Sequence, residues 1–464
     1  MKSLLSFLLL LLAAAAQAIS VGGRRILAIW DDIEEQASYS KFVRDLEDRG
    51  FKVSHATPKM ESLALFHLGS RTFDHVIIFP TKSKGLGPNL TAKVLLDFIN
   101  ANGNILLALS SSQPAPTAIN SLLLELDIQL PADRTGLVVD HFNYDASSAS
   151  DLHDVLALPP PGPLRPGLKD FFASGSKDQL LAFPRGVGHT LGSGALLTPI
   201  LRAPRTAYSY DPKEQAEVVD DLFAAGEQLA LVSAFQARNS ARFAVVGSAE
   251  MLQDKWFDAK VKKVGEKKEV ATFNREFAKR LTGWAFQEIG VVQVRWIEHH
   301  LNEEGARNIS NPSIYRIKQD VSYSISISEW QWDHWAPFIV PEGDDLQLEF
   351  SMLSPFHRLK LEHDPSRSSS EFAVYAVDFT TPDQHGIFNF MVNYKRPFFT
   401  NIEEKLTVTV RHMAHDEWAR SYLITAAYPW LGGIIATIGG WLLFVLIWLF
   451  SAPKNQASTI KKTQ

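Results

Sequence analysis

The chain has 464 residues, 46% hydrophobic and 21% charged, a composition typical of globular proteins that excludes a disordered or fibrous chain. Its 46 lysines and arginines stand against 51 aspartates and glutamates, so its net charge of -5 excludes a global attraction to nucleic acid. The absence of cysteine excludes disulfides, thiolate nucleophiles and cysteine-ligated metals.

Residues 1–18 have the pattern of a secretory signal peptide. Lys2 precedes an apolar run over Leu4–Ala16, and small residues at Ala16 and Ala18 form a cleavage-site pattern. An uncleaved anchor is the alternative, but the apolar run is short for a membrane span. We therefore predict cleavage after Ala18.

Strands and helices alternate between residues 19 and 287. Short apolar runs predict buried strands at Ile26–Trp30, Val53–Ala56, Val76–Phe79, Ile105–Leu109, Leu229–Phe235 and Arg242–Gly247. Helical spacing occurs at Glu35–Asp48, Thr91–Asn100 and Phe273–Phe286. This order predicts a luminal α/β domain with a parallel, doubly wound sheet.

The pattern changes to period two in residues 288–426. Val321, Tyr323, Ile325 and Ile327 alternate with serines, and similar alternation recurs at Leu346–Met352, Ile387–Tyr394 and Leu406–Val410. Several alternating runs separated by turn residues predict a luminal antiparallel β-sandwich.

Residues 427–451 contain a charge-free apolar run, Leu431–Phe450, long enough to cross a bilayer as one helix. The lysines beyond it predict a cytosolic tail at 452–464 and a single-pass type I membrane protein. Lys461 and Lys462 are candidates for a dilysine signal that returns proteins to the endoplasmic reticulum. Solvated lysines beside a membrane are the alternative.

Three small residues of the span, Gly432, Ala436 and Gly440, recur every four positions and so share one helical face. This face is a candidate surface for docking another helix, although glycine is common in spans without such a role. In a luminal chain, Asn89 and Asn308 are candidate N-glycosylation sites, because each begins an Asn-x-Ser/Thr motif.

Polar residues follow two of the predicted strands. Asp31 and Asp32 end the first, and Ser110, Ser111 and Ser112 follow the strand at Ile105–Leu109, where open α/β sheets place ligands. A hydrolase would use one serine as nucleophile, but the Gly-x-Ser-x-Gly elbow is missing. Turn chemistry explains these residues at least as well.

Two further clusters have chemical and structural interpretations. His412, His415, Asp416 and Glu417 form an HxxHDE cluster without the HExxH order of zinc proteases, so we expect membrane-proximal polar residues. The aromatic segment Trp330–Trp335 could stack on sugar rings, but a sandwich core or a subunit interface also favours tryptophan.

The chain as a whole resembles the family of oligosaccharyltransferase 48 kDa subunits, from the signal peptide to the tail. The resemblance is carried by Ile26–Asp32 (ILAIWDD), Leu137–Tyr144 (LVVDHFNY), Trp332–Phe338 (WDHWAPF), His385–Thr400 (HGIFNFMVNYKRPFFT), Val410–His412, Asp416–Arg420 and Tyr428–Trp430. Such order over nearly the full length is more specific than any single motif.

The resemblance implies a glutamine-amidotransferase-like first domain, β-rich domains and one helix within an endoplasmic reticulum membrane complex. That complex transfers a preassembled glycan from dolichyl-pyrophosphate to Asn in Asn-x-Ser/Thr. The family assigns transfer and its divalent metal to a separate multi-span subunit, so no catalytic, cofactor-binding or metal-binding residue is carried over to this chain.

The expected partners are that multi-span subunit, other subunits and the membrane, and the expected roles are assembly of the complex and positioning of donor or substrate. The alternatives are a luminal sugar-binding receptor that recycles on its dilysine tail and a degenerate luminal hydrolase.

Overall fold

The computed structural model describes residues 20–451 apart from 61–62, 133–135, 165–169, 174–178, 211–221, 267, 304–308 and 419–424. The predicted signal peptide, the predicted tail with Lys461 and Lys462, and the acceptor Asn308 lie outside the described residues. The chain forms two compact units, Met1–Val410 and Arg411–Gln464, each of which is described by itself.

A seven-stranded sheet forms the centre of the α/β region, in the order β12-β14-β15-β6-β5-β1-β2. All six strands predicted for this region lie in it, and those from β15 to β2 run parallel. The strands are β1 (Arg25–Ile29), β2 (Lys52–Ala56), β5 (His75–Ile78), β6 (Asn104–Ala108), β12 (Leu197–Arg202), β14 (Ala230–Gln236) and β15 (Arg242–Val246).

The prediction of a parallel, doubly wound sheet is wrong at one edge. β14 is antiparallel to both β15 and β12. Residues 237–241 are the whole connection from β14 to β15, which permits a hairpin but not the crossover that parallel neighbours need.

The helices of this region follow the predictions in part, and a capping residue explains where one of them begins. α3 (Ala92–Asn100) begins after Thr91, whose hydroxyl accepts the N–H of Val94 at 3.3 Å. The helix predicted at Glu35–Asp48 is divided into a 3-10 turn, η1 (Ile33–Tyr39), and α2 (Ser40–Asp48). The other helical segments are η2 (Pro88–Leu90), α4 (Thr117–Glu125), η3 (Gly226–Gln228), η4 (Ala249–Leu252), α5 (Asp254–Phe257) and α6 (Asn274–Ala285).

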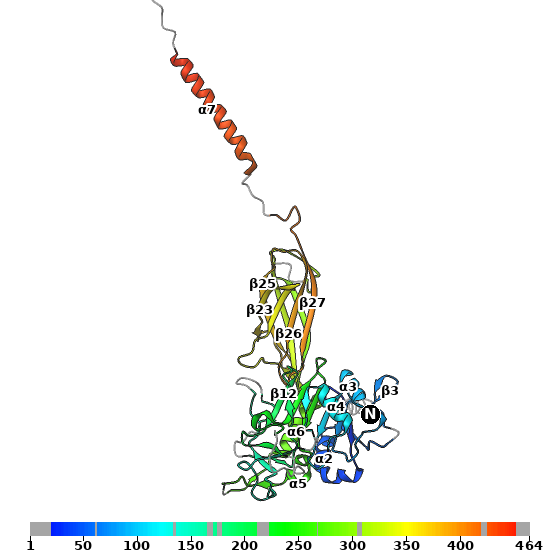
Figure 1. Cartoon of the computed structure of the whole chain (residues 1–464). Coiled ribbons are helices and arrows are strands. Elements are labelled where there is room, and N and C mark those ends of the chain that lie inside the picture. Colours follow the sequence, from blue (N-terminus) through cyan, green and yellow to red (C-terminus); the bar gives the residue numbers. More distant parts are fainter. Residues whose placement is uncertain are drawn as a thin grey trace, which may run out of the picture. The chain divides into compact units, whose positions relative to one another are not determined.

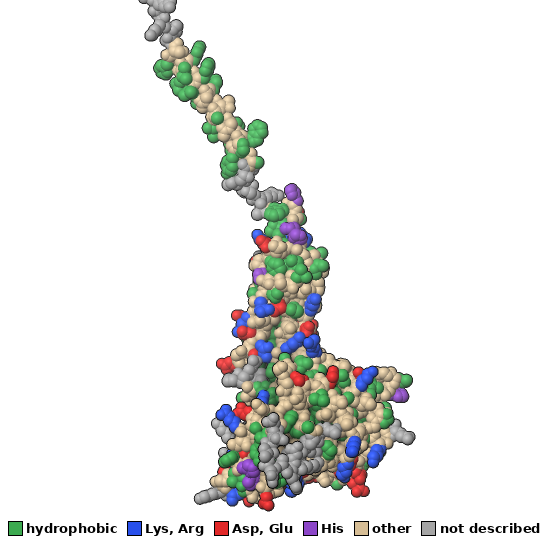
Figure 2. Space-filling view, in the orientation of Figure 1, with side chains coloured by type: hydrophobic (Ala, Val, Ile, Leu, Met, Phe, Trp, Pro, Cys, Tyr) green, Lys and Arg blue, Asp and Glu red, His purple; other side chains and the backbone are tan. Residues whose placement is uncertain are grey.

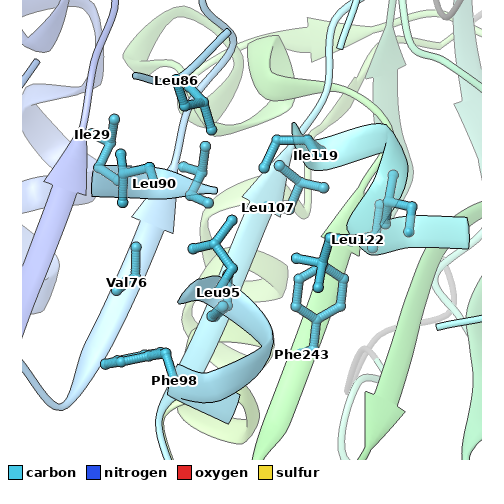
Figure 3. Packing of buried hydrophobic residues seen from close by; sticks show 14 of the residues in the cluster. Ile29, Val76, Leu86, Leu90, Leu95, Phe98, Leu107, Ile119, Leu122 and Phe243 are labelled. Atoms are coloured by element: carbon cyan, nitrogen blue, oxygen red, sulfur yellow. The ribbon is translucent and has the colours of Figure 1, made fainter. Parts of the chain in front are cut away.

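The largest apolar core lies between one face of the sheet and helices α3 and α4 (Figure 3). Leu95 and Phe98 of α3 and Leu122 of α4 are at most 1% exposed and lie over Leu107 and its neighbours. Because successive strand residues point to opposite faces, the alternate residues of β6 and β15 face α6, which contacts both strands.

Five short strand pairs surround this core, and the sequence did not predict them because runs of two to four residues carry no clear period. They are β3 (Phe66–His67) with β4 (Ser70–Arg71), β7 (Ile128–Gln129) with β11 (Thr190–Leu191), β8 (Leu137–Val139) with β13 (Tyr208–Tyr210), β9 (Val155–Leu158) with β10 (Leu181–Pro184), and β16 (Lys260–Val261) with β17 (Val270–Ala271).

Two antiparallel sheets form the β-rich region, as the alternation predicted (Figure 1). One contains β18 (Ile289–Leu301), β20 (Asp320–Gln331), β21 (His334–Pro337), β24 (Glu362–Asp364) and β25 (Ala373–Thr380). The other contains β19 (Ile314–Arg316), β22 (Gln347–Met352), β23 (Ser354–Lys360), β26 (Gly386–Tyr394) and β27 (Ile402–Arg411). Their inner faces meet through aromatic rings: Tyr323 of the first sheet stacks on Phe390 of the second, with centroids 5.3 Å apart.

In the second unit, the helix α7 (Tyr428–Phe450) follows the turn η5 (Thr425–Ala427). Of the helices in the described residues, α7 alone is long and apolar enough to cross a membrane. None of its side chains is buried, and Figure 2 shows hydrophobic groups around it. A helix of 23 residues is about 34 Å long, which matches the hydrocarbon layer.

Candidate functional site

The carboxyl ends of the parallel strands place Asp31 and Asp32 at one edge of the sheet. Asp31 accepts the backbone N–H of Lys82 at 3.0 Å, and the ammonium of Lys82 lies 3.6 Å from its carboxylate. Asp32 caps η1 by accepting the N–H of Glu34 at 3.3 Å. Both carboxylates therefore bind loops of the chain itself.

The three serines after β6 lie at the same edge and form a turn. The hydroxyl of Ser111 donates to the carbonyl oxygen of Arg185 at 2.8 Å, and the hydroxyl oxygens of Ser110 and Ser112 are 2.8 Å apart. Within the described ranges, no imidazole contacts any of these hydroxyls. A serine nucleophile needs an adjacent base, so this arrangement favours turn stabilisation over catalysis.

An ion pair that the sequence did not reveal lies beside this serine turn. Arg185, whose φ is +41°, donates from Nε to Glu250 Oε1 at 2.9 Å, and its Nη2 contacts the other carboxylate oxygen. The hydrogen bond to Glu250 raises the pKa of Arg185. The two residues are 65 positions apart and belong to no motif, so only the fold brings them together.

The Trp330–Trp335 segment lies at the junction between the α/β region and the sandwich. Trp330 is 8% exposed and packs edge-on against Trp335, with ring centroids 5.2 Å apart. Trp332 contacts α6 so closely that a Cβ at Gly283 would lie 2.7 Å from its ring. Trp332 therefore contributes to the interface between the two regions.

A cavity of about 280 Å³ adjoins Trp332 at this junction. It is lined by Asp170, Phe171, Glu276, Lys279, Arg280, Ile289, Glu329, Gln331 and Trp332. An indole surrounded by charged and amide groups can stack on a sugar ring and hydrogen-bond its hydroxyls. The cavity thus gives the sugar-binding hypothesis a physical basis in the described chain.

A buried charge pair lies close to this cavity and was not predicted. Glu288 is 0% exposed, and Nη1 of Arg49 contacts its carboxylate. Arg49 also donates to Thr282 Oγ1 at 2.8 Å. Burial raises the pKa of Glu288 to about 7, while the charge of Arg49 opposes that rise. Glu288 follows the predicted helix without any sequence signal of burial.

A second buried cation, Arg242, joins the same junction. Its guanidinium donates to the carbonyl oxygens of Ile289 at 2.7 Å and Gly290 at 2.8 Å, and also to that of Trp284. These acceptors are the last turn of α6 and the first residues of β18. The α/β region is therefore fixed to the sandwich by hydrogen bonds from a fully buried side chain.

The HxxHDE cluster follows β27. Glu417 accepts both Nη atoms of Arg411 at 2.7 Å and the backbone N–H of Ala414 at 2.7 Å. In the part of the chain that the structure describes, no three His, Asp or Glu side chains are placed to hold a metal ion. The carboxylate of Glu417 thus stabilises a turn.

The remaining candidates stay predictions. Asn89 lies in η2 and is partly exposed, just before the cap of α3. A Cβ added at Gly432 or Gly440 of α7 would meet no atom within 4 Å, so both are open to another helix.

Family models match most of the chain. The model described as "OST48, N-terminal domain" matches residues 17–288, and the model of the OST48 middle domain matches residues 299–452.

Curated relatives match almost end to end. The dolichyl-diphosphooligosaccharide–protein glycosyltransferase subunit wbp1 of Schizosaccharomyces pombe is 35% identical over 449 residues, which are 96% of each chain. The 48 kDa subunits of the same glycosyltransferase are 28% identical in Arabidopsis thaliana, covering 96% of this chain and 97% of that one, and 30% identical in Danio rerio, covering 97% of each.

One solved structure, a ThuA-like protein of Parabacteroides merdae, covers 56% of this chain and 89% of its own at 11% identity. Its TM-score of 0.29 is too low to name the fold.

Proposed function

The chain belongs to the OST48 family, and we propose that it is an accessory, non-catalytic subunit of the oligosaccharyltransferase complex, which glycosylates Asn in Asn-x-Ser/Thr of nascent proteins. Its role is to assemble and stabilise the complex and to help position donor or substrate. The observation that carries this proposal is the combination of one apolar span with a sheet edge whose polar groups bind the chain's own loops.

A non-catalytic role is supported by the chemistry of the sheet edge. Asp31, Asp32 and the Ser110–Ser112 turn all form hydrogen bonds within the chain, and Arg185 forms an ion pair with Glu250. Handling a polyisoprenoid donor in the bilayer needs a groove between several spans, which a single α7 cannot form. We therefore place the transfer reaction and its divalent metal in a separate multi-span subunit.

The topology that fits this role is type I, with residues 19–426 in the lumen of the endoplasmic reticulum and 452–464 in the cytosol. α7 forms the membrane span. The signal-peptide pattern directs the chain into the endoplasmic reticulum, and Lys461 and Lys462 form the signal that returns it there. We also propose that the α/β region is amidotransferase-like, because its parallel strands carry helices on both faces and its sheet edge presents loops. The missing cysteine accords with a binding or scaffolding role.

The test is depletion of the protein followed by gentle solubilisation of the membranes. Transfer to an Asn-x-Thr peptide and recovery of the partner subunits are measured together. We expect both to be lost and both to be restored by the wild-type chain and by a triple variant with Ser110, Ser111 and Ser112 changed to Ala. Partners restored without transfer by the triple variant would place chemistry in this chain, and unchanged transfer and partners after depletion would contradict the scaffold role.

The second candidate, a recycling sugar receptor, is favoured by the cavity beside Trp332. It predicts that the purified full chain, free of other subunits, binds oligosaccharides and that Gln331→Ala weakens this binding. Gln293→Ala, on β18 and outside the cavity lining, is the control. A receptor of this kind would also leave peptide glycosylation intact after depletion, which separates it from the first candidate.

A further inference from the structure

The hairpin β22–β23 ends in an exposed apolar tip, which we define as Met352, Leu353, Phe356 and Ile387. Leu353 joins the two strands and is fully exposed, and Ile387 and Phe356 are 63% and 40% exposed. Leu353 also has a φ of +64°, a conformation that favours glycine or asparagine. Leu353 adjoins the exposed Phe356 and Ile387, so these side chains together form an apolar patch, which is the kind of surface that contacts another molecule or a membrane.

The apolar tip is held on a rigid base. The ring of Phe356 packs edge-on against Phe388 with centroids 5.3 Å apart, and Phe388 stacks on Phe350 at 4.6 Å. Gly386 approaches Met352 so closely that an added Cβ would lie 2.5 Å from the sulfur. The base of the apolar tip is therefore packed, and Leu353 projects from it.

The apolar tip lies at the end of the sandwich from which the chain continues toward α7. Gly386 pairs with Val410 and Ile387 pairs with Thr409, so the start of β26 adjoins the end of β27. Residues 411–427 then lead to α7, and 17 extended residues span at most about 60 Å. The length of this connection therefore keeps the end of the sandwich within about 60 Å of the first residue of α7.

The same end is polar elsewhere, since the loop before β26 contains Asp383 and His385. Hydrophobic side chains gather on the face shown in Figure 2 at this end of the sandwich. A small apolar projection beside polar groups suits shallow insertion among lipid headgroups and the first acyl carbons, and does not suit a second span.

We propose that the apolar tip inserts into the surface of the lipid bilayer, in the leaflet that faces the sandwich. This inference rests on the proposed function only through its membrane span, α7. Insertion gives Leu353 and Ile387 an apolar environment and fixes the height of the sandwich above the membrane.

The absence of cysteine makes the test direct, because a single introduced cysteine carries a spin label at one chosen place. Leu353→Cys is compared with Leu68→Cys in the full chain, reconstituted alone in phosphatidylcholine vesicles. Leu68 is a matched control: it is 93% exposed, has a φ of +49° and joins the short strands β3 and β4. Ile438→Cys in α7 reports whether the span is inserted.

Collisions of the label with oxygen, which concentrates in lipid, are compared with collisions with a water-soluble nickel complex. We expect the oxygen-to-nickel ratio at position 353 to exceed that at position 68 several-fold and to approach that at 438. Equal ratios at 353 and 68 with a high ratio at 438 would overturn the insertion and leave the span intact.

A low ratio at 438 would instead contradict the span and with it the proposed topology. A further measurement adds the other subunits of the complex. If position 353 becomes shielded from nickel only after that addition, and oxygen collisions do not rise, the apolar tip contacts a protein partner. That result would overturn the lipid proposal. Equal thermal unfolding of the 353 and 68 variants controls for folding.

Discussion

The guanidinium carbon of Arg242 lies 5.0 Å from the ring centre of Trp284, and both side chains are fully buried. No carboxylate pairs with Arg242 among the described residues, so its charge is stabilised by three carbonyl oxygens, one of which, that of Trp284, lies at the carboxyl end of α6. Burial lowers the pKa of Arg242 to about 9. This cation–π and hydrogen-bond contact joins the sheet, α6 and the sandwich.

Replacing this buried cation is expected to weaken the junction. Arg242→Met removes the donor to three buried carbonyls, which should lower the free energy of unfolding by about 3–5 kcal/mol. The measurement is urea unfolding of the detergent-solubilised chain followed by tryptophan fluorescence. Arg238→Met, an exposed arginine in the adjacent hairpin, is the control and should change stability by less than about 0.5 kcal/mol. Equal effects of both substitutions would refute this account of the junction.

Much of the fold could be predicted because strands such as Ile105–Leu109 are uninterrupted apolar runs, and because apolar residues alternate with serines in residues 321–328 of the sandwich. The direction of β14 was missed because periodicity does not encode direction, although the short link to β15 does. The sequence could not predict that Glu288 and Arg242 are buried and that Arg49 is largely buried, since charged residues are ordinarily exposed. Their burial results from contacts between segments far apart in the sequence, such as those of Arg49 with Thr282 and of Arg242 with Gly290, which local patterns do not describe.

Gly290 is expected to be essential at the same junction. Its φ is +68°, and an added Cβ would lie 2.4 Å from the carbonyl oxygen of Phe398. Gly290→Ala should therefore lower the free energy of unfolding by about 3 kcal/mol or more, because it combines backbone strain with a clash against the main chain. Gly343, with a φ of +86° and no atom within 4 Å of its added Cβ, isolates the strain. Thermal unfolding of both variants is the measurement, and Gly343→Ala should lower the free energy of unfolding by only about 1 kcal/mol. A loss of stability as large as that of Gly290→Ala would show that backbone strain alone explains the effect and would contradict a contribution from the clash.

Acidification should destabilise the protein through His75. This ring is fully buried, its Nδ1 is 3.1 Å from the Asn104 amide nitrogen, and its Nε2 is 3.1 Å from the Gly23 carbonyl oxygen. Burial lowers the pKa of His75 to about 4, although Asp74 opposes this. The stability contributed by the neutral ring is complete above the unfolded pKa of about 6.5 and is lost as the pH falls toward 4, by up to about 3 kcal/mol.

The measurement is the free energy of unfolding at pH 7, 6 and 5 for the wild type and His75→Gln. Because the glutamine does not titrate, the difference in stability between the two proteins should shrink as the pH falls. His67→Gln, at an exposed position, should leave the pH dependence unchanged. A constant difference between the wild type and His75→Gln would show that this ring does not lose stability on acidification.

The small-residue face of α7 is expected to control recovery of the chain with its partners. Gly432, Ala436 and Gly440 lie about one helical turn apart, and a Cβ added at either glycine would meet no described atom within 4 Å. Helices associate in lipid through close packing, so Gly432→Leu together with Gly440→Leu should hold a partner helix at a greater distance. We expect several-fold lower recovery of partner subunits from gently solubilised membranes. Val445→Phe enlarges a residue on the opposite face of α7 and should leave recovery unchanged. If both changes lower recovery equally, the helix contributes through its bulk apolar surface and not through this face.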